Sequence, residues 1–161
     1  MSEDEGKDFN IVEAGMHDLD ALVPLFDQYR IFYEQPSDPA LARRFLRARI
    51  EHRSSVVFLA VEPQEDGEKA LGFALLYPSF NSVMATPIWI LNDLYIIESA
   101  RRRGVAQALI ARGKALAEET GARAMSLSTA KENAPSRKLY ESLDFSLDET
   151  FCTYVLQFGA T

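Results

Sequence analysis

The segment from Trp89 to Ile110, WILNDLYIIESARRRGVAQALI, restricts the fold more than any other part of the chain. It opens with an apolar run, breaks at Glu98, and passes through three arginines and a glycine into an amphipathic pattern. The apolar run predicts a strand, and the spacing of Val105 and Leu109 predicts a helix. Strand, basic turn and helix in this order are typical of a phosphate site, because the first N–H groups of a helix have no partner inside it.

The basic turn places Arg101, Arg102 and Arg103 where the helix dipole favours an anion. A nucleoside-triphosphate P-loop needs a Gly-Lys-Ser/Thr ending, which the chain lacks. A dinucleotide fingerprint needs three spaced glycines, whereas this turn has only Gly104. Taken alone, a run of arginines is more often a solvated surface, and a glycine before a helix is often only a turn. A specific interpretation therefore needs a second motif.

Two motifs together resemble the GNAT superfamily of acyl-CoA-dependent N-acetyltransferases. The turn resembles the family's pyrophosphate-binding motif Q/R-x-x-G-x-G/A, since it reads Arg101-x-x-Gly104-x-Ala106. Further on, Asn133 and the run LYESLDF resemble the family's strand-to-helix Asn and its Leu-Tyr-Glu-x-x-Gly-Phe ending. The resemblance extends from Leu91 to Phe145, and Asp-Leu-Tyr-Ile and Leu-Tyr bring it nearest to the diamine and polyamine acetyltransferase branch.

The resemblance implies an α/β fold with a GNAT-like mixed sheet of about seven strands and helices on both faces. We expect a flexible tail at residues 1–8 and a single N-acetyltransferase domain at residues 9–159. Hydrophobic periodicity predicts strands at residues 9–13, 55–62, 70–77, 88–97, 124–129, 145–147 and 150–158. It predicts helices at residues 17–34, 39–52, 103–120 and 134–143, with a loop at 78–82. Pro24 is expected to start or kink the first helix.

Composition excludes several classes of protein. The net charge of −7 argues against nucleic acid as a general partner. No apolar run approaches the ~20 residues that span a bilayer, so we expect no membrane segment and a cytoplasmic location. Cys152 is the single cysteine and is expected to be a small buried residue in a strand. His17 and His52 have no ligand-like spacing with it, so we expect no metal.

Acetyl-CoA is the co-substrate that the resemblance implies. The turn from Arg101 to Ala106 would bind its diphosphate, and the backbone of the central strand would pair with its pantetheine arm. One N–H of that strand would polarise the acetyl carbonyl. Asn133 would bind pantetheine amides, with the helix-cap role equally plausible. By resemblance, the cofactor contacts are Leu94, Tyr95, Ile96, Arg101, Arg102, Arg103, Gly104, Val105, Ala106, Asn133 and Ser136.

The resemblance also implies that Tyr140 protonates the departing thiolate, the alternative being a core aromatic. For the base, Asn92 and Asp93 are the only polar side chains in the apolar run from Ile88 to Ile97. The polyamine branch often carries a glutamate where Asn92 stands. Asp93 could act as the base, directly or through a water, or it could fix a neighbouring backbone bulge. Glu34 is a weaker candidate for the base.

An aromatic cluster with an acidic neighbour is expected to bind the acceptor ammonium, unless it only packs under a loop. Its members are Tyr29, Phe32, Tyr33, Glu34 and Tyr77. The sequence thus predicts direct transfer of an acetyl group to a primary amine of a small molecule. The alternatives are a protein or peptide N-acetyltransferase and a catalytically weak acyl-CoA-binding module. Homodimers are common among the relatives, and the C-terminal strand could support one.

Overall fold

The computed structural model describes residues 8–159, which form two compact units. The first unit ends at Ser128 and the second begins at Thr129. The single domain expected at residues 9–159 stays a prediction. The expected tail lies outside the described residues except for Asp8.

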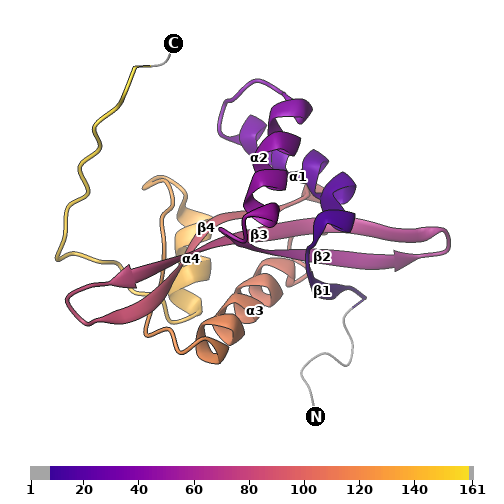
Figure 1. The fold of residues 1–161 in the computed structure, drawn as a ribbon. Helices are drawn as coiled ribbons and strands as arrows, with labels where there is room; N and C mark the ends of the chain where they lie inside the picture. The colour runs from indigo at the N-terminus through magenta and orange to yellow at the C-terminus, as the bar shows by residue number, and fades with distance from the viewer. Residues whose placement is uncertain (1–7, 160–161) are drawn as a thin grey trace. The chain divides into compact units, whose positions relative to one another are not determined.

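The first unit contains one five-stranded sheet in the order β1-β2-β3-β4-β5 (Figure 1). Neighbouring strands are antiparallel as far as β4, and β5 then runs parallel to β4. The strands are β1 (Asn10–Glu13), β2 (Val56–Gln64), β3 (Gly67–Asn81), β4 (Thr86–Ile96) and β5 (Met125–Leu127). The mixed sheet of the predicted fold is therefore confirmed.

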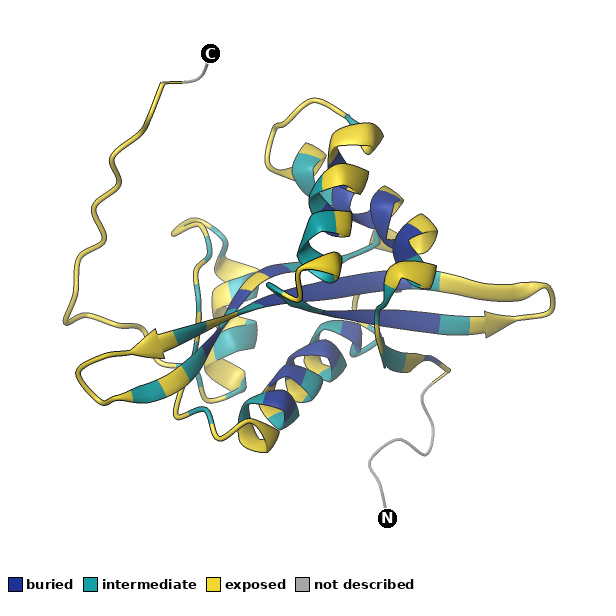
Figure 2. Ribbon diagram, in the orientation of Figure 1, coloured by how far each residue is buried: buried dark blue, intermediate teal, exposed yellow. Residues whose placement is uncertain are grey.

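Helices cover both faces of this sheet. The helices α1 (Leu19–Phe32) and α2 (Pro39–Glu51) lie on one face, and α3 (Val105–Glu119) lies on the other (Figure 1). Short 3-10 turns, Met16–Asp18 and Glu98–Ala100, precede α1 and follow β4. Buried residues line the sheet side of the helices and the middle of β2 and β3 (Figure 2). The core thus lies between the sheet and its two helical layers.

Local sequence explains how α2 begins, whereas packing explains how α1 tolerates an internal proline. The Asp38 carboxylate caps α2 by accepting a hydrogen bond from Leu41 N at 2.9 Å, and Pro39 takes the first helical position. Pro24 lies inside α1, so the prediction that it starts the helix is wrong, and the alternative, a kink at Pro24, stays a prediction. Leu22 and Phe26 on either side of it are buried in the core, and this packing outweighs the helix-breaking tendency of proline.

Three other predictions need correction. Residues 78–81 belong to β3 and pair with β4, so the expected loop is shortened to the hairpin turn at 82–85. The strands expected at 145–147 and 150–158 are absent from the described chain, which lowers the strand count from about seven to five. Cys152, predicted to be buried in the last of them, is exposed. An alternating apolar pattern forms a strand only where a partner strand supplies hydrogen bonds.

The second unit contains the helix α4 (Ala134–Ser142). Its C-terminal end forms a left-handed cap with a non-glycine residue, since Asp144 has φ 69°. Asp144 N donates to Glu141 O at 3.2 Å, and Phe145 N donates to Tyr140 O at 3.0 Å. These bonds make a Schellman motif, in which the Tyr140 and Phe145 rings meet with centroids 6.1 Å apart.

Candidate functional site

A β-bulge interrupts β4 at Asn92. Leu75 of β3 lies opposite Asp93, whereas the next residue, Leu76, lies opposite Leu91. Asn92 is therefore the extra residue, and its side chain is exposed while that of Asp93 is buried. Bulges of this kind bend a strand and redirect a side chain, and they are frequent next to active sites. The bulge expected near Asp93 is confirmed.

The strand β4 separates from β5 at the same point. The two strands pair only from Trp89 to Leu91, and no described strand covers that edge of β4 afterwards. Ile97 N donates to Leu71 O of β3 at 2.9 Å, and backbone direction alternates along a strand. Leu94 and Ile96 therefore direct their backbone groups to the open edge. Arg101 Nε donates to Ile96 O at 3.2 Å there, which leaves the Leu94 amide and carbonyl for a ligand.

The Asp93 carboxylate is held in the core between β4 and α1. It is 5% exposed. The Tyr29 hydroxyl donates to Asp93 Oδ1 at 2.7 Å, and Asn92 Nδ2 donates to the same oxygen at 3.0 Å. Burial raises the pKa of Asp93, and the hydrogen bonds from Tyr29 and Asn92 oppose that rise. The result is a rigid carboxylate that gains a proton more readily than an ordinary aspartate.

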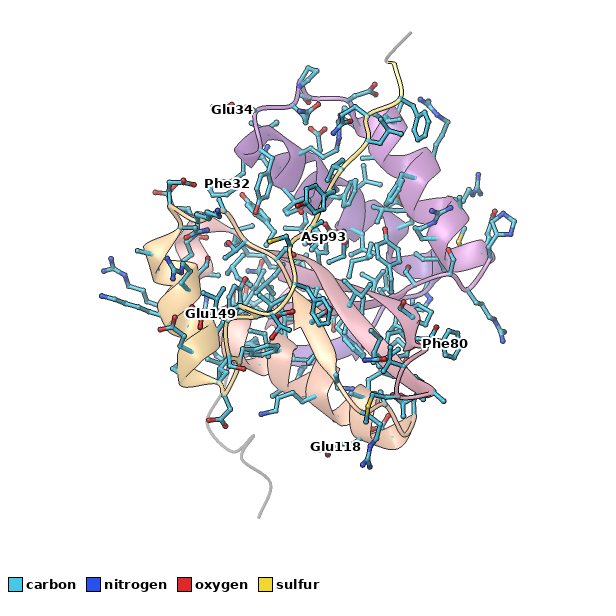
Figure 3. All side chains as sticks on the ribbon, turned by 90° about the vertical axis from the view of Figure 1, so that its left-hand side faces the viewer. Phe32, Glu34, Phe80, Asp93, Glu118 and Glu149 are labelled. Carbon is cyan, nitrogen blue, oxygen red and sulfur yellow. The ribbon has the colours of Figure 1, made fainter. Side chains whose placement is uncertain are left out.

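Aromatic rings extend from this carboxylate to the surface. The Tyr29 and Tyr33 ring centroids are 5.1 Å apart, and those of Tyr33 and Phe32 are 5.2 Å apart. Phe32 is 57% exposed. The pKa of Tyr77 is raised by burial and by the Asp93 charge, while the Arg49 guanidinium opposes the rise. In contrast, Glu34 lies in the exposed loop beyond α1, farther from the sheet than Asp93 (Figure 3).

A buried aspartate that the sequence prediction missed fixes the loop between α1 and α2. Asp27 accepts hydrogen bonds from Ser37 Oγ at 2.6 Å and from Asp38 N at 2.8 Å. These bonds and the nearby Arg30 guanidinium hold the pKa of Asp27 below its usual value. An acidic residue on the apolar side of α1 was the available signal. Asp27 thereby holds in place the loop that follows Phe32 and Tyr33.

The turn before α3 has the backbone that a diphosphate site requires. Gly104 adopts a left-handed conformation with φ 80°, and no described atom lies within 4 Å of the position that a Cβ would occupy. The N–H groups of Val105 and Ala106 begin α3 and have no acceptor within the helix. A phosphorylated ligand could therefore approach the backbone closely here.

Arg103 does not present a free guanidinium at this turn. Its Nη2 contacts the Asp8 carboxylate at 2.6 Å and also that of Glu62 on β2. Arg103 therefore ties β2 and the chain before β1 to the start of α3. Arg101 donates to Ile96 O, as described above, and Arg102 is exposed with φ 63°. Arg101 and Arg102 are both exposed, whereas Arg103 is half-buried, so the first two are the ones that an anion can reach.

The remaining predicted site residues belong to the second unit. Asn133 caps α4, because its Oδ1 accepts a hydrogen bond from Ser136 N at 3.3 Å. The helix-cap interpretation of Asn133 is therefore confirmed, and its role toward a cofactor stays a prediction. Tyr140 lies in the last turn of α4, where the Schellman motif fixes it against Phe145.

Residues 8–159 contain no group of three or more His, Cys, Asp or Glu side chains that could hold a metal ion. Within the same residues, no helix has the length and apolar character to cross a membrane.

Comparison with known proteins gives concordant matches. The sequence pattern of the Acetyltransferase (GNAT) family matches residues 20–145. An uncharacterized N-acetyltransferase of Bacillus subtilis (strain 168), YhfO, is 41% identical over 94% of this chain and 99% of its own. A crystal structure of a probable acetyltransferase superposes with a TM-score of 0.87 at 43% identity, covering 94% and 99% of the two chains. AAC(6')-Iy in complex with the bisubstrate analogue CoA-S-monomethyl-acetylneamine gives a TM-score of 0.75 at 25% identity, with coverages of 93% and 99%.

Proposed function

The chain belongs to the GNAT family of acetyltransferases, and from this we propose that it transfers an acetyl group from acetyl-CoA to a primary amine of a small molecule by direct attack. The observation that carries the proposal is the Asp93 carboxylate, buried beside the bulge and next to an open strand edge. A buried carboxylate with a raised pKa is expensive to maintain and suits proton transfer.

The thioester of acetyl-CoA would supply the activated acetyl group. The backbone of the turn from Arg101 to Ala106 would bind the diphosphate, with Arg102 adding charge. Leu94 to Ile96 would hold the pantetheine arm along the open edge of β4, as a neighbouring strand would. The Leu94 N–H is the best-placed donor for the thioester carbonyl, because it points to that edge next to the bulge.

Asp93 would act as the general base for the acceptor. An alkylammonium has a pKa near 10 and must lose a proton before its nitrogen attacks. Asp93 Oδ2 would accept that proton, directly or through a water, since the hydrogen bonds from Tyr29 and Asn92 both go to Oδ1. The Asn92 amide would thus support the base. The polyamine branch often carries a glutamate at the Asn92 position, and the Asp93 carboxylate would take over the role of that glutamate.

Tyr140 is proposed as the acid that protonates the departing thiolate. A phenol carries its proton at neutral pH and can donate it to sulfur. The Schellman motif at the end of α4 restrains this tyrosine, which favours a defined role. Asn133 and Ser136 at the other end of the helix are the proposed cofactor contacts of the second unit.

The acceptor is proposed to be a compound with several amines, of the diamine or polyamine class. Tyr29, Phe32, Tyr33 and Tyr77 would surround its ammonium groups, with Glu34 at the outer end. The net charge of −7 would favour the approach of such a cation. AAC(6')-Iy, whose bisubstrate analogue joins coenzyme A to acetylneamine, supports a small-molecule amine as the acceptor class. A cytoplasmic location, where a free cysteine stays reduced, belongs to the same proposal.

A thiol-release assay tests the proposal. The purified chain is incubated with acetyl-CoA and single members of a panel of diamines, polyamines, aminoglycosides and short peptides. Product mass is recorded alongside free thiol. We expect an acetylated small amine and faster thiol release than with acetyl-CoA alone. Acetylation of peptides only, or coenzyme binding without turnover, would favour a protein N-acetyltransferase or an acyl-CoA-binding module instead.

A further inference from the structure

We propose that Tyr29 is a positioning residue that holds the Asp93 carboxylate with one oxygen turned toward the acceptor amine. This inference rests on the proposed function and goes beyond it, because the aromatic cluster was assigned to acceptor binding alone. It gives Tyr29 a role in proton transfer that Tyr33 and Phe32 do not share.

The geometry of the contact separates the two carboxylate oxygens. Tyr29 reaches Asp93 Oδ1 from α1, and Asn92 reaches the same atom from the bulge of β4. Both of these hydrogen bonds go to Oδ1, and neither donor uses Oδ2. Two donors on one oxygen, coming from separate elements, prevent the carboxylate from rotating. Oδ2, which neither Tyr29 nor Asn92 uses, is the oxygen that would receive the acceptor proton.

Packing keeps the Tyr29 ring in one orientation. Its centroid lies 5.1 Å from that of Tyr33 and 5.9 Å from those of Phe26 and Phe73. These rings come from α1, from the residue that follows it and from β3, so the hydroxyl cannot leave Asp93 without displacing them. Removing the hydroxyl alone would preserve the contacts, because phenylalanine has the same ring. Tyr29→Phe is therefore a clean test of the hydrogen bond.

The surroundings of Tyr29 keep its hydroxyl protonated, so it can donate a hydrogen bond throughout the pH range of an activity assay. Burial, the Asp93 hydrogen bond and the Asp93 charge all raise the pKa of Tyr29, so the phenol stays protonated. The other titratable groups acting on Tyr29 are Tyr33, just after α1, and Tyr77 of β3. The Arg49 guanidinium of α2 lowers the pKa of Tyr77, against the effects of burial and of Asp93. The hydrogen bond from Tyr29 lowers the pKa of Asp93, so its removal raises that pKa further.

The test compares Tyr29→Phe with Tyr33→Phe, a neighbouring tyrosine whose hydroxyl makes no hydrogen bond to Asp93. The pH profile of kcat/KM is measured with saturating acetyl-CoA for two acceptor amines of different pKa. A rising limb that has the same midpoint with both amines reports the ionisation of a group on the enzyme and not that of the amine. We expect Tyr29→Phe to move this limb to higher pH by about one unit. On the acid side of the limb, kcat/KM should therefore fall about 10-fold, with an unchanged KM for acetyl-CoA. Tyr33→Phe should leave the limb in place.

A second measurement covers the case in which Tyr29→Phe is poorly folded. Replacing Tyr29 with a ring-fluorinated tyrosine makes the phenol a stronger donor at almost unchanged size, and should move the limb to lower pH. The Asp93 carboxyl titration, followed by carbon NMR and assigned with Asp93→Asn, should move in parallel with each limb. A limb that stays in place in both variants would overturn the inference and leave the proposed function standing. A wild-type chain that releases no thiol with any amine would overturn both.

Discussion

At the scale of single residues, Asp93 shows a conflict between stability and chemistry. Its pKa is raised in the folded protein, mainly by burial. A carboxyl with a raised folded pKa binds its proton more tightly when folded than when unfolded. Its contribution to stability is therefore fully present below the unfolded pKa and is lost as the pH rises through the folded pKa. At neutral pH the charged form weakens the fold, which is typical of a functional group.

The variant Asp93→Asn should therefore unfold at higher denaturant concentration than the wild type at pH 7. The gain should disappear near pH 3, where both forms are neutral. The amide oxygen can still accept from Tyr29 and Asn92, so the site keeps its packing. Loss of a general base should lower kcat by roughly 10² to 10⁴. Urea unfolding at both pH values and the thiol-release assay check the two effects. A destabilised Asn variant would show that the charged form is needed for folding.

Asp144 is a residue at which sequence and structure agree in detail. It stands where the family motif has glycine, a residue suited to a left-handed helix cap, and its φ is indeed 69°. We expect Asp144→Gly to raise the free energy of unfolding by about 0.5 kcal/mol, because the strain relieved exceeds the entropy lost. Asp144→Val should lower it by about 1–2 kcal/mol, since a β-branched residue tolerates this conformation poorly. Chemical denaturation measures both, and a glycine variant less stable than wild type would contradict the argument.

At the scale of elements, α3 carries glycines in the same conformation at its two ends. Gly104 precedes the helix with φ 80°, and Gly121 follows it with φ 70°. Neither has a described atom within 4 Å of an added Cβ. Only the first lies where backbone N–H groups would meet a diphosphate. Substitutions at the two glycines therefore distinguish two effects: backbone strain, which both would cause, and interference with diphosphate binding, which only a substitution at Gly104 would cause.

Gly104→Ala and Gly121→Ala should each lower the free energy of unfolding by about 1 kcal/mol, because each forces alanine into the left-handed region. Gly104→Ala alone should raise the KM for acetyl-CoA, by about 10-fold if a hydrogen bond to the diphosphate is lost. Thermal unfolding and initial rates over a range of acetyl-CoA concentrations measure the two quantities. Equal KM values in the two variants would remove the diphosphate from this turn.

At the scale of the whole molecule, the elements that depend on neighbouring residues could be predicted from the sequence, whereas contacts between distant residues could not. The strand, turn and helix from β4 to α3 follow from apolar runs and one left-handed glycine, and α2 follows from Asp38 and Pro39. The partner of Asp93 could not be predicted, because Tyr29 is 64 residues away in the chain and meets it only through folding. The same holds for Arg103, whose carboxylate partners come from the chain before β1 and from β2.

The last strands expected from the sequence show the limit of pattern alone. Residues 150–158 are rich in apolar residues but are irregular and exposed in the second unit, where Phe151 is 80% and Tyr154 is 92% exposed. Burying such a segment gains free energy with each apolar side chain removed from water. A run of exposed aromatics of this length is typical of an interaction surface rather than of a monomer in water. The homodimer expected from the sequence stays a prediction, and this segment is the place to test it.

We expect the full chain to sediment as a dimer at micromolar concentration and the double variant Phe151→Asp, Tyr154→Asp to sediment as a monomer. Carboxylates in an apolar interface lose hydration without gaining partners, so they oppose association strongly. Phe80→Asp is the matched control, because Phe80 is 77% exposed on the β3–β4 hairpin and lies outside the segment (Figure 3). It should leave the dimer intact. A wild-type chain that sediments as a monomer, or a dimer that survives the double substitution, would mean that the apolar side chains of residues 150–158 do not hold two copies together.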